Sequence, residues 1–271
     1  MIHLLFLLKA NELKKIFFRK ILFIIISFFT INCTEYKLSG HESNNNIIDN
    51  NLLTDDFSQL QLKKFKDTLE KEMNEVINYC NKELDVGSPE GLLGNFIADL
   101  SLISVKSINN IKNSPDFCVL NNGGLRTSMN KGPVTRGNIY EIMPFDNHFV
   151  IIKIEPKTMN ELLSYIKNRS FMGESRKAGV PVSGIRIRIT NNDIDKCMIN
   201  NQEIDNKKSY YVLTTDYLAN GGDGMVFFKS CKNKYPLKIL LRDVIIDYIM
   251  KIAEANITID AQLDGRIEIT E

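Results

Sequence analysis

The spacing of hydrophobic and polar positions predicts alternating helices and strands from Phe57 onward. Apolar residues recur at helical spacing among lysines and glutamates over residues 57–73, which predicts an amphipathic helix there. The same spacing predicts helices over residues 93–111, 156–166 and 237–252. Short apolar or alternating runs predict strands over residues 76–79, 117–120, 149–154, 185–189, 210–214 and 266–269.

The interleaving of these elements predicts an α/β or mixed α+β domain with glycine-rich loops after several strands. In the strand at 185–189, isoleucines alternate with Arg186 and Arg188, so we expect one exposed face. Residues 57–271 are enough for one domain with a substantial core.

The N-terminal segment has the layout of an export signal, with four basic residues before the apolar run 21–29 and Cys33 after it. The run is shorter than the roughly 20 apolar residues of a membrane span. Cys33 is placed like the acylated cysteine of a bacterial lipoprotein; an uncleaved anchor and simple secretion are the alternatives. We predict a leader over 1–33, a polar flexible tether over 34–56 and a domain over 57–271, exported and lipid-anchored at the bacterial cell envelope.

Composition narrows the classes of function. The chain has 271 residues, 44% apolar and 25% charged, as expected of a packed globular protein. Its net charge of +1 argues against a protein that coats nucleic acid, which needs a basic face. The domain has four cysteines and no C-x-x-C pair, so they either form disulfides or serve as small buried side chains. These are Cys80, Cys118, Cys197 and Cys231.

Self-sufficient hydrolysis is not expected. Of the three histidines, His3 lies in the leader and His41 in the tether, which leaves His148 in the domain. A two-metal hydrolase site needs several His, Asp and Asn ligands, and one histidine cannot build the usual version. The common hydrolase and nucleotide-binding motifs do not occur. We therefore predict no catalytic residue, metal ligand or cofactor in this chain.

Three loops hold the side chains that a ligand could use: the first loop (residues 121–126), the second loop (144–147) and the third loop (216–224). The first joins two amides, two glycines and an arginine, which offers donors to phosphate or sugar oxygens. The other two each supply an aromatic ring, and the third adds a carboxylate. Each loop alone is typical of an ordinary turn, but together they favour a binding site.

The strings NNGGLRT, EIMPFDN and DYLANGGDG resemble, in this order, the hallmark segments of the C-terminal domain of 5'-nucleotidases. Residues 91–99 resemble the opening helix of that domain and residues 264–267 its final strand. The resemblance spans about residues 74 to 270. It implies a fold of layered mixed sheets with flanking helices and a site for a nucleotide or nucleoside.

The resemblance also implies roles for single residues. Two aromatic rings would clamp the base, an amide would meet the base edge, and a carboxylate would accept the ribose hydroxyls. An amide and an arginine of the first loop would reach the sugar and phosphate. In the same order these are Phe145 and Tyr217, Asn147, Asp223, and Asn121 with Arg126. Two departures stand out: relatives often have Phe where this chain has Tyr217, and residues 87–95 lack the arginine that many relatives use for phosphate.

Members of the family usually carry an N-terminal metallophosphatase domain with two metal ions, and none precedes Phe57 in this sequence. The resemblance therefore implies a substrate-recognition part of an enzyme, which acts with a separately encoded metallophosphatase that carries the divalent metal pair. Two alternatives stay open. The chain is a stand-alone nucleotide- or nucleoside-binding surface lipoprotein, or it is a scaffold whose pocket is vestigial.

Overall fold

The computed structural model describes residues 15, 17–21, 56–173, 175 and 177–271. Contacts divide the chain into two units, residues 1–54 and 55–271. The described residues of the first unit are helical and exposed. Cys33 and nearly all of the predicted leader and tether lie outside the described residues. In the described part of the chain, no helix is both long and apolar enough to span a membrane.

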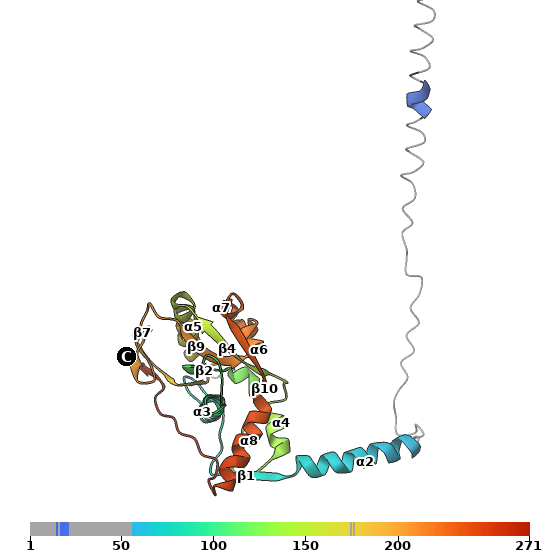
Figure 1. The fold of residues 1–271 in the computed structure, drawn as a ribbon, viewed down its shortest axis with the longest axis vertical. Coiled ribbons are helices and arrows are strands. Elements are labelled where there is room, and N and C mark those ends of the chain that lie inside the picture. Colours follow the sequence, from blue (N-terminus) through green and yellow to red (C-terminus); the bar gives the residue numbers. More distant parts are fainter. Residues whose placement is uncertain (1–14, 16, 22–55, 174, 176) are drawn as a thin grey trace, which may run out of the picture. The chain divides into compact units, whose positions relative to one another are not determined.

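A five-stranded sheet forms the centre of the second unit, in the order β10-β4-β9-β2-β5 (Figure 1). β2 and β9 are parallel, and the other neighbours in this sheet are antiparallel. The strands are β2 (Phe117–Val119), β4 (His148–Ile154), β5 (Val182–Ser183), β9 (Tyr210–Thr215) and β10 (Lys234–Leu240).

β4 shows why this sheet lies in the middle. Its side chains alternate between two hydrophobic cores: Phe149 and Ile151 point into one, and Val150, Ile152 and Ile154 into the other. A strand that is buried on both faces is apolar at nearly every position, as this run is.

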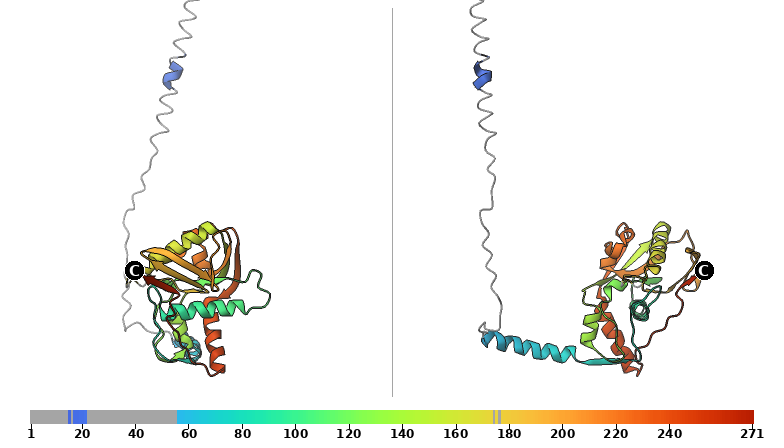
Figure 2. Two further views of the ribbon diagram at one scale, coloured as in Figure 1. Left: turned by 90° about the vertical axis from the view of Figure 1, so that its left-hand side faces the viewer. Right: turned by 180° about the vertical axis from the view of Figure 1, so that it is seen from behind.

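The first core lies between the sheet and helices α3, α4 and α8, and the second between the sheet and helices α5, α6 and α7 (Figures 1 and 2). The helices of the first core are α3 (Leu92–Lys106), α4 (Arg136–Ile142) and α8 (Leu241–Glu254). Those of the second are α5 (Pro156–Ser170), α6 (Asp216–Ala219) and α7 (Val226–Lys229).

Two smaller sheets complete the domain. One pairs β1 (Val76–Cys80) with β3 (Gly132–Thr135), and the other has the order β11-β6-β7-β8 and adds apolar residues to the second core. The strands of the second sheet are β6 (Ile185–Thr190), β7 (Asp193–Ile199), β8 (Gln202–Glu203) and β11 (Ile267–Thr270). The predicted alternation in β6 is confirmed, since its isoleucines are buried and Arg188 is exposed.

The predicted α/β class with layered mixed sheets is confirmed, and so are most of the predicted elements. The helix predicted over 237–252 is wrong in its first turn. Leu237 and Leu240 belong to β10, which pairs with β4, and the helix begins only at Leu241. Pairing with a buried neighbour overrides the helical spacing here. The helix predicted over 93–111 ends at Lys106.

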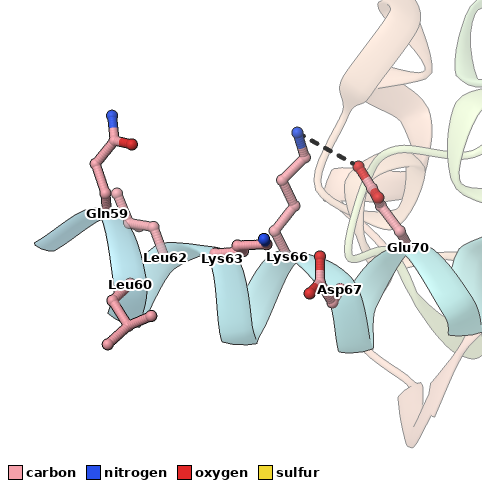
Figure 3. A pocket seen from close by; sticks show the side chains of 7 residues that line it. All are labelled: Gln59, Leu60, Leu62, Lys63, Lys66, Asp67 and Glu70. Atoms are coloured by element: carbon pink, nitrogen blue, oxygen red, sulfur yellow. Dashed lines mark ion pairs between the residues drawn. The ribbon is translucent and has the colours of Figure 1, made fainter. Parts of the chain in front are cut away.

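The predicted helix over 57–73 is present as α2 (Asp56–Met73), but most of its apolar side chains are exposed. Phe57, Leu60 and Phe65 are 70–72% exposed. Figure 3 shows side chains along α2, where an open hollow of about 820 Å³ is lined by residues of this one helix. The only ion pair drawn there joins Lys66 to Glu70 at 3.6 Å. This hollow is formed by one exposed helix alone, with no second element among the described residues that line it, so we do not treat it as a candidate site.

The four domain cysteines are free thiols, and three of them are buried. Burial raises the pKa of Cys197 to about 12, and it also raises the pKa of Cys118. Thiols of this kind stay protonated and act as small apolar side chains. Of the two alternatives, Cys80, Cys118 and Cys197 fit the small buried side chain, and the free thiol of Cys231 is half-buried.

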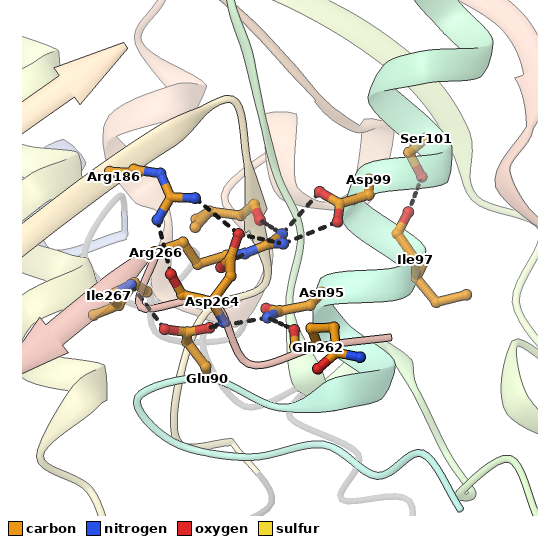
Figure 4. A network of polar contacts seen from close by, with 11 residues as sticks. Glu90, Asn95, Ile97, Asp99, Ser101, Arg186, Gln262, Asp264, Arg266 and Ile267 are labelled. Carbon is orange, nitrogen blue, oxygen red and sulfur yellow. Dashed lines mark hydrogen bonds and ion pairs between the residues drawn. The ribbon is translucent and has the colours of Figure 1, made fainter. Parts of the chain in front are cut away.

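A polar network around Arg266 joins α3, near the start of the domain sequence, to the segment before β11, near its end (Figure 4). Its guanidinium donates to both carboxylate oxygens of Asp99 on α3 at 2.8 and 2.9 Å, and to the carbonyl of Val182 at 2.8 Å. It also donates to Asp264 at 2.9 Å. Burial alone would raise the pKa of Asp264, but hydrogen bonds and charge from Arg266 outweigh it and lower the pKa.

Glu90 continues this network from the segment before α3. One of its oxygens accepts from the backbone N–H of Ile267 at 3.1 Å, and the other from the side chain of Asn95 at 2.9 Å (Figure 4). The start of β11 is therefore fastened to the segment before α3 and, through it, to the first turn of that helix.

We predict that Arg266→Met lowers the free energy of unfolding by about 2–4 kcal/mol, because it leaves a buried carbonyl and two carboxylates without their donor. Arg188→Met is the matched control: Arg188 pairs with Glu268 at 2.9 Å on the exposed face of the sheet that contains β11, and exposed pairs contribute little. Urea denaturation of both variants checks this. An equal loss of unfolding free energy in the two variants would show that the buried contacts of Arg266 stabilise the domain no more than an exposed ion pair does.

Candidate functional site

The three predicted loops meet at one edge of the central sheet. The first loop follows β2 and the third follows β9, and these strands are parallel, so their carboxyl ends lie at the same edge. The second loop precedes β4, which is antiparallel to β9, so its amino end lies there as well. Phe149 pairs with Thr215, and each lies two positions from a loop residue, Asn147 and Tyr217. Ligands of α/β sheets bind outside the carboxyl ends of strands, as this arrangement allows.

The loops enclose a cavity of about 230 Å³. All six side chains that the sequence singled out line it, together with two glycines and one lysine. The lining residues are Asn121, Gly123, Gly124, Arg126, Phe145, Asn147, Lys177, Tyr217 and Asp223. Residues up to 102 positions apart in the chain thus share one cavity.

Asp223 is held from several sides. It has φ = 51°, in the left-handed region that Asp tolerates better than most residues. Its Oδ2 accepts from the Asn121 side chain at 2.5 Å, and its backbone N–H donates to the Tyr217 hydroxyl at 3.2 Å. A Cβ on Gly123 would lie 2.9 Å from Oδ2, so glycine allows this close approach. Oδ1 accepts no hydrogen bond from any described residue and is available to a ligand.

Tyr165 and Arg169 on α5 hold the backbone carbonyl of Asp223. The Tyr165 hydroxyl donates to it at 2.8 Å and the Arg169 guanidinium at 2.7 Å. The guanidinium lies 5.0 Å from the centre of the Tyr165 ring, in cation–π contact. Burial raises the pKa of Tyr165, so its hydroxyl stays protonated and remains a donor. Both residues position Asp223 from outside the cavity.

The two aromatic rings are open on the cavity side. Phe145 is 43% exposed and Tyr217 48%, and neither makes a ring contact with another described residue. The backbone of Gly222 lies against the Tyr217 ring, since a Cβ at Gly222 would come within 2.5 Å of it. One face of Tyr217 is therefore supported by backbone.

Asp216 ties the second and third loops together. Its Oδ1 accepts from the backbone N–H of His148 at 3.2 Å and of Tyr217 at 2.8 Å. Its Oδ2 lies 3.6 Å from Nδ1 of His148. The carboxylate thus connects the start of β4 to the start of α6, next to Tyr217.

The second loop is held by the first turn of α8. Arg242 donates to the carbonyl of Met143 at 3.3 Å and to Asp146 at 2.5 Å, and its guanidinium lies 4.3 Å from the centre of the Tyr140 ring. Its side chain is 10% exposed. The backbone N–H of Leu241 donates to the carbonyl of Asn147 at 2.9 Å, so both ends of the loop are fixed.

Sequence reasoning missed Lys177 as a cavity residue and Arg169, Arg242 and Asp216 as its supports. Lys177 stands in a loop without a recognisable motif, and only its basic character in a glycine-bounded segment could have indicated a role. Arg169, Arg242 and Asp216 contact loop residues that are distant in the sequence, and the spacing of residues along the chain does not reveal such contacts. Among the described residues, no group of three or more His, Cys, Asp or Glu side chains is placed to hold a metal ion.

The three loops at the edge of the central sheet can be compared with those of known proteins. The family model for the 5'-nucleotidase C-terminal domain matches residues 72–230. The chain therefore belongs to the family of 5'-nucleotidase C-terminal domains, a nucleotide-binding family.

Similar proteins agree with this. The chain is 26% identical over 228 residues to the trifunctional nucleotide phosphoesterase protein YfkN of Bacillus subtilis, covering 77% of this chain and 15% of that protein. It is 26% identical over 178 residues to the 5'-nucleotidase of Vibrio parahaemolyticus, covering 64% and 30%. The fold resembles that of a 5'-nucleotidase precursor from Thermus thermophilus, with a TM-score of 0.64, 24% identity, and 79% and 43% of the two chains covered. The chain thus spans less than half of each of these proteins.

We predict that Arg242→Met lowers the free energy of unfolding by about 1–3 kcal/mol, because the buried Met143 carbonyl loses its side-chain donor. The loss should concentrate in the second loop, so amide hydrogen exchange at residues 145–148 should accelerate more than in the core strands. Exchange mapped by mass spectrometry, with Arg188→Met as the control, checks this. Unchanged exchange in the second loop would show that Arg242 does not hold it.

Proposed function

We propose that this chain binds a nucleotide or nucleoside in the cavity of the three loops and contributes substrate recognition to nucleotide hydrolysis. The observation that carries the proposal is the convergence of two exposed aromatic rings, a free carboxylate oxygen, two amides and an arginine on one cavity. Each group matches a different part of a nucleotide.

The base lies between Phe145 and Tyr217, and Asn147 meets its edge. Stacking on an aromatic ring contributes about 1–3 kcal/mol per base and tolerates any base, because every base has a π-face. The free Oδ1 of Asp223 accepts from the ribose hydroxyls, while Asn121 and Arg126 face the sugar and phosphate. The donors and acceptors of the cavity are complementary to those of the ligand.

The size of the cavity is consistent with a division of roles between this chain, which binds the nucleoside part, and a second protein. Ligand pockets generally measure about 300–1,000 Å³, and this one, at about 230 Å³, is small. In this proposal the base and ribose occupy the cavity and the phosphate lies at its mouth. There it is accessible to a second protein.

We propose that this second protein is a separately encoded metallophosphatase that carries a divalent metal pair. The described residues offer no ligand set for such a pair, so no metal-dependent step is assigned to this chain. Its own contribution is to hold base and ribose so that the phosphate is presented in one orientation. Such positioning can supply a large part of a rate enhancement.

We also propose that the chain is exported and tethered to the bacterial cell envelope through a lipid on Cys33. The support is the sequence alone: basic residues, the apolar run 21–29 and a cysteine directly after it. A lipid anchor would keep the domain close to its partner at the membrane surface.

The proposal predicts AMP hydrolysis by the full-length chain mixed with a candidate metallophosphatase and divalent metal, and none by the chain alone. Phe145→Ala and Tyr217→Ala should each weaken AMP binding by about 5- to 150-fold, the effect of losing one stacking partner. Tyr79→Ala is the matched control, since its ring is 56% exposed on β1 outside the cavity. Phosphate release and calorimetric binding measure the two effects.

Hydrolysis by the chain alone would overturn the division of labour. Tight binding of AMP or adenosine without stimulation of any metallophosphatase would favour a stand-alone binding lipoprotein. If AMP and adenosine do not bind at all, the proposal of a nucleotide site fails and a scaffold role is favoured.

The anchor is tested separately. Cys33→Ser should move the chain from the membrane fraction to the soluble fraction of the cells that produce it, and it should abolish incorporation of labelled fatty acid. Cys231→Ser, at a half-buried free thiol, is the control and should leave both unchanged. Full membrane retention without label in the Cys33→Ser chain would indicate an uncleaved N-terminal anchor.

A further inference from the structure

Lys177 lines the cavity, although no motif marked it. It lies between α5 and β5, in a segment that packs against residues 87–88. Gly179 has φ = 70° and comes so near to Gly87 that a Cβ on it would lie 2.2 Å from the Gly87 carbonyl oxygen. The Asn122 side chain joins the two segments by donating to the carbonyls of Gly87 at 3.0 Å and of Ala178 at 2.6 Å.

The backbone of Lys177 is held in place. Its carbonyl accepts from the Arg169 guanidinium at 3.0 Å, and its N–H donates to the Ser175 hydroxyl at 3.3 Å. The same guanidinium holds the carbonyl of Asp223 at 2.7 Å. One arginine outside the cavity therefore fixes the backbones of two cavity residues, an acid and a base.

The ammonium group of Lys177 is unengaged. It forms no hydrogen bond or ion pair with any described residue, and its side chain is exposed. The neighbouring segment 87–95 contains no lysine or arginine. The charged side chains that line the cavity are thus Arg126, Lys177 and Asp223, and the carboxylate of Asp223 already accepts from Asn121.

We infer that Lys177 is a specificity-determining residue that binds the phosphate of the ligand and makes this cavity prefer nucleotides over nucleosides. The inference rests on the proposed nucleotide site and adds a residue to its phosphate end. An ammonium on a flexible stem binds phosphate as a point charge, whereas Arg126 offers a planar fork of donors. Two cations also outweigh the single carboxylate of the cavity, so a dianionic phosphate is attracted to its mouth.

Binding of AMP and of adenosine to the full-length chain, measured by calorimetry at low and high salt, tests this inference. The wild type should bind AMP more tightly than adenosine. Lys177→Met should weaken AMP binding by about 5- to 30-fold and leave adenosine binding unchanged, because adenosine has no phosphate to lose a charge-assisted bond. The salt dependence of AMP binding should fall as well.

Two further variants sharpen the result. Lys177→Arg keeps the charge and should retain the preference for AMP. Lys157→Met removes an exposed lysine at the opposite end of α5, far from the cavity, and should behave as the wild type. Thermal unfolding of each variant confirms that the comparison is made on folded protein.

The outcomes separate the two proposals. If the wild type binds both ligands and Lys177→Met keeps the preference for AMP, the role of Lys177 is refuted and the nucleotide site stands. An equal loss for AMP and adenosine would also refute it, because a supporting role in the loop would act on both. If the wild type binds neither ligand, the nucleotide site itself fails.

Discussion

The central sheet is buried on both faces, and the burial of β4 and β9 between two cores is the constraint on which the site depends. Alternate side chains of β4 enter opposite cores, so a shift of one residue would exchange every side chain between them. This makes the register of β4 against β9 strongly determined. Since Phe149 pairs with Thr215, the loop before β4 and the loop after β9 must emerge side by side.

Hydrogen bonds hold the parts of the three loops that hydrophobic packing does not. Leu125 and Leu218 anchor the first and third loops in the two cores, and the backbone carbonyls of the loops need donors where they are shielded from water. Arginines supply these donors from rigid helices: Arg169 from α5 and Arg242 from α8. Each arginine also lies against a tyrosine ring, Tyr165 or Tyr140, which restricts its side chain. The cavity is thus formed by loops whose positions are determined by helices.

The loops could be predicted from sequence, because glycines, amides and aromatics cluster within short stretches of chain, and six side chains of the cavity belong to such stretches. Lys177 could not be predicted, because its place comes from the packing of its segment against Gly87, 90 positions earlier. Strand β10 shows the same limit. Leu237 and Leu240 continue the apolar spacing of α8, but both belong to β10, in which Leu240 pairs with His148 of β4. Lys238 at φ = 54° marks the irregular pairing between Pro236 and Leu240. Local spacing cannot reveal a partner that lies so far away in the chain.

The contacts of Asp223 bear on how the site is organised. Its carboxylate is bonded to the first loop, its N–H to Tyr217 and its carbonyl to α5, so the first and third loops form one unit with that helix. The second loop, with Phe145, is fastened instead to α8 on the other side of the sheet. The two aromatic rings therefore belong to separately anchored parts of the domain. The pairing of β4 with β9 and the bridge made by Asp216 set the distance between the two rings. Neither of these contacts requires a ligand.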